Sequence, residues 1–266
     1  MTWPELMQSP PPLSMTGVLA FMERWAPGST RGFVPATAEQ IEALGRAHGR
    51  VGTLPLVYRD FLAVMGQSTG RLRLKAGTTS ILALLDDLAD RSTPSPDPRR
   101  YFKFALGEEG AEERGPDDFF DLARPTADGR DAAVIRIRED LLTKGLSAPA
   151  QPFPTFSDWL RSVIISRVVF EVEPAKQTQY CNLGANPEAP SRAYAFFLRA
   201  GFSLTEFGAS PAFVPLEHRG RGAVALIRAP SASVPRAAVE VRAHDKTQQQ
   251  SLAELIADHR DSLRGG

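Results

Sequence analysis

The spacing of hydrophobic residues changes along this chain from a helical to a strand pattern, and this change most limits the folds open to it. Between Ser14 and Met65, apolar residues recur every three to four positions, the spacing of helices with one buried face. Over residues 101–138 they form short runs separated by turn residues, which is typical of strands. A helical pattern returns at Thr155. Helices followed by consecutive strands predict an α+β fold rather than alternating βαβ units.

Four helices are expected before these strands. The first begins near Ser14, and the second begins at Thr37, where Gln40 stands at the spacing of a capping box. The third begins at Leu54-Pro55, with proline in its tolerated first-turn position, and a shorter fourth begins at Thr79 or Ser80. The side chains expected on the buried faces are Val18, Phe21, Met22, Trp25, Ile41, Leu44, Ala47, Tyr58, Phe61, Leu62, Met65, Ile81, Leu84, Leu85 and Leu88.

The strand signals and a closing helix follow. Strands are expected at 71–75, 101–106, 119–123 and 132–138, and Asp128-Gly129 suits the tight turn between the last two. The helix from Thr155 should bury Phe156, Trp159, Leu160, Val163 and Ile164. The rest of the chain predicts a strand at 168–172, a helix at 191–200, strands at 202–207, 212–216, 223–228 and 237–243, and a helix at 251–259.

The length of 266 residues corresponds to about 1.8 domains at roughly 150 residues each. We expect an extended tail over residues 1–13, an α+β domain over 14–168, and a small α+β module of unassigned role over 169–266. Residues 169–266 are enough to bury a small core of their own.

Composition narrows the possible functions. Lys+Arg and Asp+Glu both number 31, so the net charge is zero, which argues against direct binding to nucleic acid. No apolar run approaches 18 residues and the N-terminus lacks a signal-peptide pattern, so we expect no membrane association and a cytoplasmic location. The single cysteine, Cys181, excludes an internal disulfide framework.

Candidate catalytic and metal-binding residues are few. Gly66–Gly70 matches G-x-S-x-G, but a helix pattern precedes it, so we interpret it as a helix end and a turn. Cys181 has no base at a suggestive spacing. The four histidines, His48, His218, His244 and His259, have no i, i+3 or i+4 spacing. A group of arginines in residues 219–242 is interpreted as solvated side chains around a turn between two strands. They are Arg219, Arg221, Arg228, Arg236 and Arg242. We therefore predict no catalytic, cofactor-binding or metal-binding residues.

One segment is strongly acidic. Within 14 residues it places seven acids against the single base Arg114: Glu108, Glu109, Glu112, Glu113, Asp117, Asp118 and Asp121. Two interpretations stay open, a solvated loop and a docking surface for a basic partner. In the docking interpretation, the four glutamates would act together through their negative electrostatic field. The three aspartates flank or enter a strand and would make defined contacts. A calcium site is a third interpretation, although the Asp-x-Asp-x-Asp-Gly pattern is absent.

Four short pieces of residues 14–168 together resemble the SUKH superfamily, whose members include a fungal cell-wall regulator and bacterial immunity proteins. The first piece runs from Ala36 to Leu44 and on to Leu54-Pro55, Tyr58 and Gly66. The others are Phe104–Gly107, then Asp117–Leu122 with the strand Ala133–Ile137, and the helix Thr155–Leu160. The order and spacing of these pieces carry the resemblance.

The resemblance implies a mostly antiparallel sheet with packed helices and a function that depends on binding. It implies an immunity-type protein that neutralises a bacterial toxin, such as a basic nuclease or deaminase domain, by direct contact and without a cofactor. Two alternatives stay open. One is a regulatory or scaffold adaptor on the same fold, and the other is an enzyme with its site in residues 169–266. The sequence does not indicate an oligomeric state.

Overall fold

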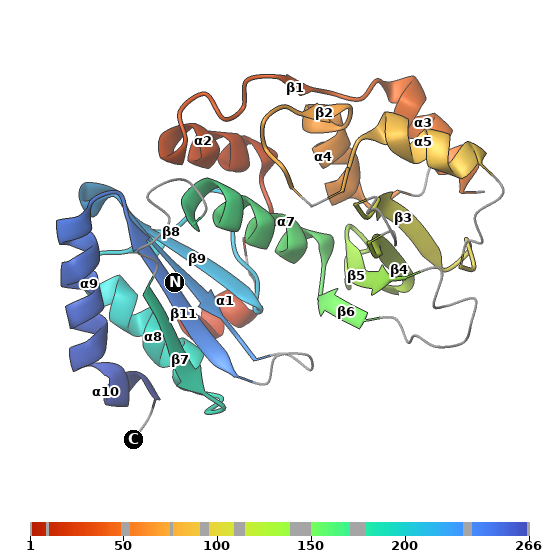
Figure 1. Cartoon of the computed structure of the whole chain (residues 1–266). Helices are drawn as coiled ribbons and strands as arrows, with labels where there is room; N and C mark the ends of the chain where they lie inside the picture. Colours follow the sequence, from red (N-terminus) through yellow and green to blue (C-terminus); the bar gives the residue numbers. More distant parts are fainter. Residues whose placement is uncertain are drawn as a thin grey trace. The chain divides into compact units, whose positions relative to one another are not determined.

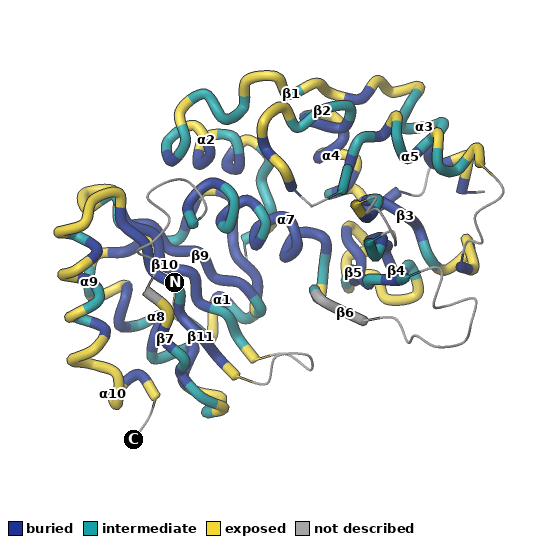
Figure 2. Tube along the Cα trace, in the orientation of Figure 1, coloured by how far each residue is buried: buried dark blue, intermediate teal, exposed yellow. Residues whose placement is uncertain are grey.

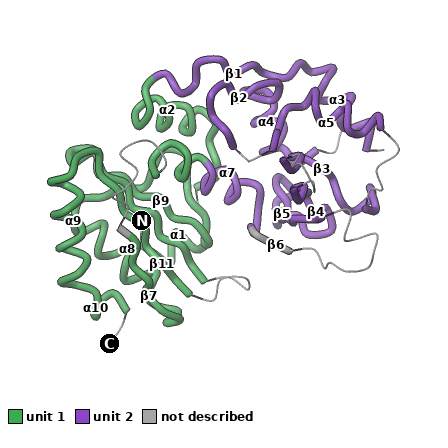
Figure 3. Tube along the Cα trace, viewed as in Figure 1, with its two compact units in different colours: residues 1–27, 164–266 green, residues 28–163 purple. Residues whose placement is uncertain are grey.

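The computed structural model describes residues 2–8, 11–48, 54–74, 77–90, 96–108, 115–138, 150–170, 179–230 and 236–264. The chain forms two compact units. Unit 1 combines residues 1–27 with residues 164–266, and unit 2 consists of residues 28–163 (Figure 3). The described helices and sheets establish the predicted α+β class. Among these helices, none has the length and apolar character needed to span a bilayer.

Unit 2 is built from helices and an antiparallel meander (Figure 1). The helices are α3 (Ala38–Ala47), α4 (Leu56–Met65), α5 (Ile81–Ala89) and the start of α7 (Phe156–Ile165). The sheet, in the order β3-β4-β5-β6, contains Tyr101–Ala105, Asp117–Pro125, Ala132–Ile137 and Ala150–Phe153. A separate antiparallel pair joins β1 (Phe33–Val34) to β2 (Ser68–Thr69).

The core of unit 2 is an aromatic cluster between the helices and the meander. Tyr58 of α4 lies with its ring centroid 5.2 Å from Phe120 of β4 and 5.4 Å from Phe156 of α7. Phe61 and Trp159 are also buried, as the apolar stripes predict. Because this cluster is contributed by two helices and two strands, it fixes the sheet against α4 and α7 through apolar burial.

Unit 1 contains a five-stranded antiparallel sheet in the order β7-β11-β10-β9-β8. These strands are Gln179–Gly184, Ala237–Ala243, Ala223–Arg228, Phe213–His218 and Ser203–Leu204. The helices are α1 (Trp3–Gln8), α2 (Met15–Trp25), α8 (Ala189–Arg199), α9 (Lys246–Asp258) and α10 (Arg260–Arg264), with a π-helix at Ser166–Phe170 and a 3-10 turn at Arg219–Arg221.

Both faces of this sheet are covered, as the buried strands in Figure 2 show. One face carries Leu216 and Val241, which share a core with Phe197 of α8 and Leu252 of α9. Residues on neighbouring positions of a strand point to opposite faces. Glu217 therefore points to the other face, where it meets α2.

Several local predictions are confirmed. Ser14 caps α2 by accepting a hydrogen bond from the Gly17 N–H. Thr37 and Gln40 form both hydrogen bonds of the capping box at the start of α3. The strands predicted at 223–228 and 237–243 have the predicted bounds. Gly129 takes a φ of 68° in the turn between β4 and β5.

Other predictions are wrong. Leu72 and Leu74 are buried, as their alternation predicted, but the described part of 71–75 forms no strand because Leu72 turns back to bond to Thr69. The described part of 168–172 continues α7 as a π-helix. Helical backbone hydrogen bonding therefore outweighs the strand propensity of the valines here. Strand 202–207 is reduced to Ser203–Leu204. The strands β6 and β7 were not predicted.

The compact units divide the chain differently from the predicted domains. The supposed extended tail, residues 1–13, contains α1, whose Leu6 is buried in the core of unit 1. The α2 segment was assigned to the first domain, yet it belongs to the same unit as residues 164–266. The compact units divide after Val163, whereas a domain boundary was predicted at 168. Sequence order misled the prediction because unit 1 is formed from two separate segments.

Candidate functional site

The three aspartates of the acidic segment lie in β4 and are buried in ion pairs within unit 2. Asp117 lies 3.1 Å from Lys103 Nζ. Asp118 accepts from Arg136 Nε at 2.8 Å, and the two residues are register partners on β4 and β5. Asp121 accepts two hydrogen bonds from Arg100, both 3.0 Å long. Each of the three carboxylates therefore has a cation of this chain beside it, although Lys103 also pairs with Asp87 at 2.8 Å.

The environment of Asp121 stabilises its ionised form. Burial acts to raise the pKa of this carboxyl, but the hydrogen bonds from Arg100 and from the Ala123 N–H outweigh burial and lower the pKa. The pairing corrects the sequence-based prediction. Asp117, Asp118 and Asp121 are buried and internally neutralised, so they do not lie on an exposed docking surface.

The glutamate part of the segment has a different setting. Glu108 is exposed, whereas Glu109, Glu112 and Glu113 lie outside the described residues. The Gly115 N–H donates to the Glu108 carbonyl at 2.8 Å, and the Gly107 N–H donates to Asp117. The first of these hydrogen bonds brings Glu108, after the end of β3, close to Gly115, before the start of β4.

The Gly66–Gly70 string contributes to a pocket of about 180 Å³. The pocket is lined by Met65, Gln67, Ser68, Thr69, Gly70, Leu72, Arg73, Leu74, Gly77, Thr78, Thr79 and Ser80. Ser68 accepts a hydrogen bond from the Gly70 N–H, and Thr78 accepts one from the Ser80 N–H, both 3.0 Å long. Among the described residues that line this pocket, serine and threonine are the most frequent types, and Arg73 is the charged residue.

The local chain around Ser68 differs from a nucleophile elbow. Helix α4 precedes it, and Ser68 pairs with Val34 in the β1–β2 ribbon, where a turn had been expected. An elbow needs a strand before the serine and a helix after it. Cys181 lies within the hydrophobic core of unit 1 as a free, buried thiol. These contacts give structural roles to both residues.

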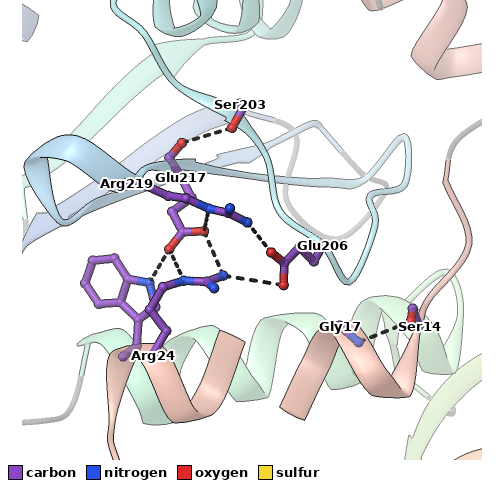
Figure 4. A network of polar contacts seen from close by, with 8 residues as sticks. Ser14, Gly17, Arg24, Ser203, Glu206, Glu217 and Arg219 are labelled. Atoms are coloured by element: carbon purple, nitrogen blue, oxygen red, sulfur yellow. Dashed lines mark hydrogen bonds and ion pairs between the residues drawn. The ribbon is translucent and has the colours of Figure 1, made fainter. Parts of the chain in front are cut away.

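Unit 1 contains a cluster of ionised residues around the buried carboxylate of Glu217 (Figure 4). Arg24 Nε and Nη2 donate to it at 2.7 and 3.0 Å, and Trp25 Nε1 donates at 3.0 Å. Glu206 pairs with Arg24 at 3.7 Å and also with Arg219. The hydrogen bonds to Glu217 raise the pKa of Arg24 despite its partial burial. Two acids and two arginines balance here, and they hold α2 to β9.

Close packing accompanies this cluster. A Cβ atom on Gly17 would lie 2.4 Å from the Glu206 carbonyl oxygen, so only glycine allows α2 to approach this turn. His244 stacks on Trp25 with ring centroids 4.0 Å apart. Burial lowers the pKa of His244, and the neighbouring Arg242 lowers it further. No sequence pattern marks this cluster, because its members lie far apart in the chain.

The other histidines have contacts of their own. His48 stacks on Phe102 at 4.0 Å, and the His218 ring accepts a hydrogen bond from the Arg221 N–H. His259 Nδ1 lies 3.0 Å from the Leu255 carbonyl oxygen. Within the described parts of the chain, no three His, Cys, Asp or Glu residues gather closely enough to hold a metal ion.

Comparison with known proteins adds no relative. No protein-family model, no curated protein and no solved structure matches this chain. The resemblance to the SUKH superfamily therefore stays a prediction.

Proposed function

We propose that this chain is a protein-binding module of the immunity type, which neutralises a toxin by direct contact and acts in the cytoplasm. The glutamate part of its acidic segment, Glu108 to Glu113, would dock a basic partner of the nuclease or deaminase class. The observation that carries this proposal is the closure of that segment by the Gly115–Glu108 hydrogen bond. Because this hydrogen bond holds Glu108 close to Gly115, we propose that the four glutamates act together as one concentrated charge.

The internal pairing of the aspartates supports this division of roles. Arg136 pairs with Asp118 and Lys103 pairs with Asp117 within the sheet, so these aspartates stabilise the base of the segment. The glutamates of residues 108–113 then supply the field that a basic surface would meet. A field of this kind accelerates association and is screened by salt, whereas each exposed carboxylate contributes little alone.

The experiment combines co-expression and direct binding. The chain is produced with the product of the neighbouring gene, and cell growth and complex formation on gel filtration are measured. We expect the wild-type chain to restore growth and to co-elute with that product. The variant E108Q/E109Q/E112Q/E113Q should bind more weakly.

A matched control removes four exposed charges elsewhere in unit 2, at Glu39, Glu42, Asp60 and Asp86. This control, with Gln or Asn at each site, should bind as the wild type does. Equal loss of binding in both variants would contradict the proposed role of the acidic segment. Binding without restored growth would favour an adaptor over an immunity protein.

A further inference from the structure

A second pocket, of about 370 Å³, lies in unit 1 at the edge of the sheet, where β7 ends and β11 begins. Helix α10 lies beside β7 at this edge (Figure 1). The register between β7 and β11 shifts at this place, and such a shift redirects side chains away from the regular ladder. The polar side chains that line the pocket are those of Asn182, Asn186, Arg236 and Arg264.

Hydrogen-bond acceptors of this lining are already used within the protein. The side-chain oxygen of Asn182 accepts from the Gly184 N–H at 2.8 Å, and that of Asn186 accepts from the Glu188 N–H at 2.9 Å. The Asn182 carbonyl accepts from Arg264 Nε at 3.0 Å, and the Arg264 carbonyl accepts from Asn186 Nδ2 at 3.1 Å. These contacts also hold both asparagines and Arg264 in fixed positions.

Hydrogen-bond donors of the same lining are left over. Arg264 keeps four N–H donors besides Nε, and Asn182 Nδ2 keeps two, because a guanidinium has five donors and an amide nitrogen has two. The Arg236 side chain has no hydrogen bond or ion pair among the described residues. Free donors beside occupied acceptors suit a ligand that only accepts hydrogen bonds, which is the property of an oxyanion.

The charges around the pocket have one sign. Arg236 and Arg264 line it, and no Asp or Glu is among the described residues that do so. Glu188, two residues after Asn186, pairs with Arg192 at 2.8 Å. Two guanidinium groups repel each other, and an anion between them would convert this repulsion into attraction. Both arginines are exposed, so a ligand from solution can reach them.

We propose that this pocket binds the phosphate group of a phosphate monoester. Such a group carries a charge of about −1.5 to −2 at pH 7 and has three strong acceptor oxygens, which match two guanidinium groups. The volume of about 370 Å³ lies in the range of small-molecule sites, so the organic part of the ester has room beside Leu183 and Ala185. The inference does not depend on the proposed function, because it concerns a different ligand and different residues.

The test is a titration of the full-length chain with phenyl phosphate, followed by amide chemical shifts in NMR spectra. It is made at about pH 7.5, where the ester is mostly a dianion because its second pKa is about 6. We expect saturable shifts that centre on residues 182–186, 236–237 and 264. Benzenesulfonate has the same ring and a tetrahedral group with one charge, and it should bind at least about tenfold more weakly.

Inorganic phosphate separates the ester from the free ion, and we expect it to bind more weakly than phenyl phosphate. Saturation by phenyl phosphate with weaker binding of both other anions supports the proposal. No saturation by phenyl phosphate, or equal binding of benzenesulfonate, overturns it. Tighter binding of inorganic phosphate would overturn the assignment to an ester.

Variants locate the site. Arg236→Gln should weaken binding of phenyl phosphate at least about tenfold, as expected for the loss of charge-assisted hydrogen bonds. Arg260→Gln is the matched control, because Arg260 is an exposed residue of α10 that does not line the pocket. Equal effects of these two variants would show diffuse surface attraction and would overturn the proposal.

A variant of Asn182 tests the free donors without disturbing the turn. Asn182→Asp keeps the side-chain oxygen that accepts from the Gly184 N–H, but it replaces the amide donors by a second carboxylate oxygen. Binding of phenyl phosphate should be lost, with a thermal unfolding midpoint close to that of the wild type. Binding equal to that of the wild type would contradict the proposed site.

Discussion

Arg24 of α2 donates two hydrogen bonds to Glu217 of β9, a residue 193 positions later in the chain. Trp25 adds a third donor to the same carboxylate. This contact explains why the N-terminal residues belong to unit 1 with residues 164–266. A buried carboxylate at the centre of three donors ties the two separate segments together.

The first prediction concerns this carboxylate. Glu217→Ala should lower the free energy of unfolding by about 3 kcal/mol, because it removes a buried acceptor of charge-assisted hydrogen bonds. Glu206→Ala is the control, since Glu206 pairs with the same arginines but is 39% exposed. Glu206→Ala should lower the free energy of unfolding by less than about 1 kcal/mol. Urea unfolding measures both values, and equal costs would contradict the role given to Glu217.

The second prediction concerns the aromatic core of unit 2. The Tyr58 hydroxyl is buried with no hydrogen-bond partner among the described residues, and burial raises its pKa. Tyr58→Phe should therefore keep or increase stability, by up to about 1 kcal/mol. Phe61→Ala in the same helix should cost about 3–5 kcal/mol through the cavity it leaves. A marked loss of stability in Tyr58→Phe would show that the hydroxyl is satisfied.

The third prediction concerns the loss of stability at acidic pH. The pKa of Asp121 is lowered in the folded chain, so its ionised form stabilises the fold above the ordinary aspartate pKa of about 3.9. That contribution is lost as pH falls through the lower, folded-state pKa. Urea unfolding between pH 7 and 3 should show a weaker acid dependence for Asp121→Asn than for the wild type. An unchanged acid dependence would contradict the pairing with Arg100.

Local structure was largely predictable because it depends on neighbours in the sequence. The capping box at Thr37 and the stripe containing Phe61 specify their helices without reference to the rest of the chain. Leu72 was predicted to be buried for the right reason, although no strand pairs with it among the described residues. Burial pattern alone does not tell which backbone a segment will pair with.

The site was harder to predict because it depends on contacts between distant residues. A run of acids in sequence does not show that Arg136 sits opposite Asp118, since that requires the register of β4 and β5. Arg100 and Lys103 likewise reach the aspartates from β3 or the residue before it. The pocket at Thr79 left no sequence signal beyond the Gly66–Gly70 string, which was interpreted as a turn.

The rate at which this chain associates with the neighbouring gene's product tests the proposed docking most directly. It is measured at ionic strengths of about 0.1 M and about 1 M, where the Debye length falls from about 10 Å to about 3 Å. We predict that E108Q/E109Q/E112Q/E113Q associates roughly tenfold more slowly than the wild type at the lower ionic strength and equally at the higher one. The variant with Glu39, Glu42, Asp60 and Asp86 neutralised should match the wild type at both. Equal association rates of the glutamate variant and the wild type at the lower ionic strength would contradict the account.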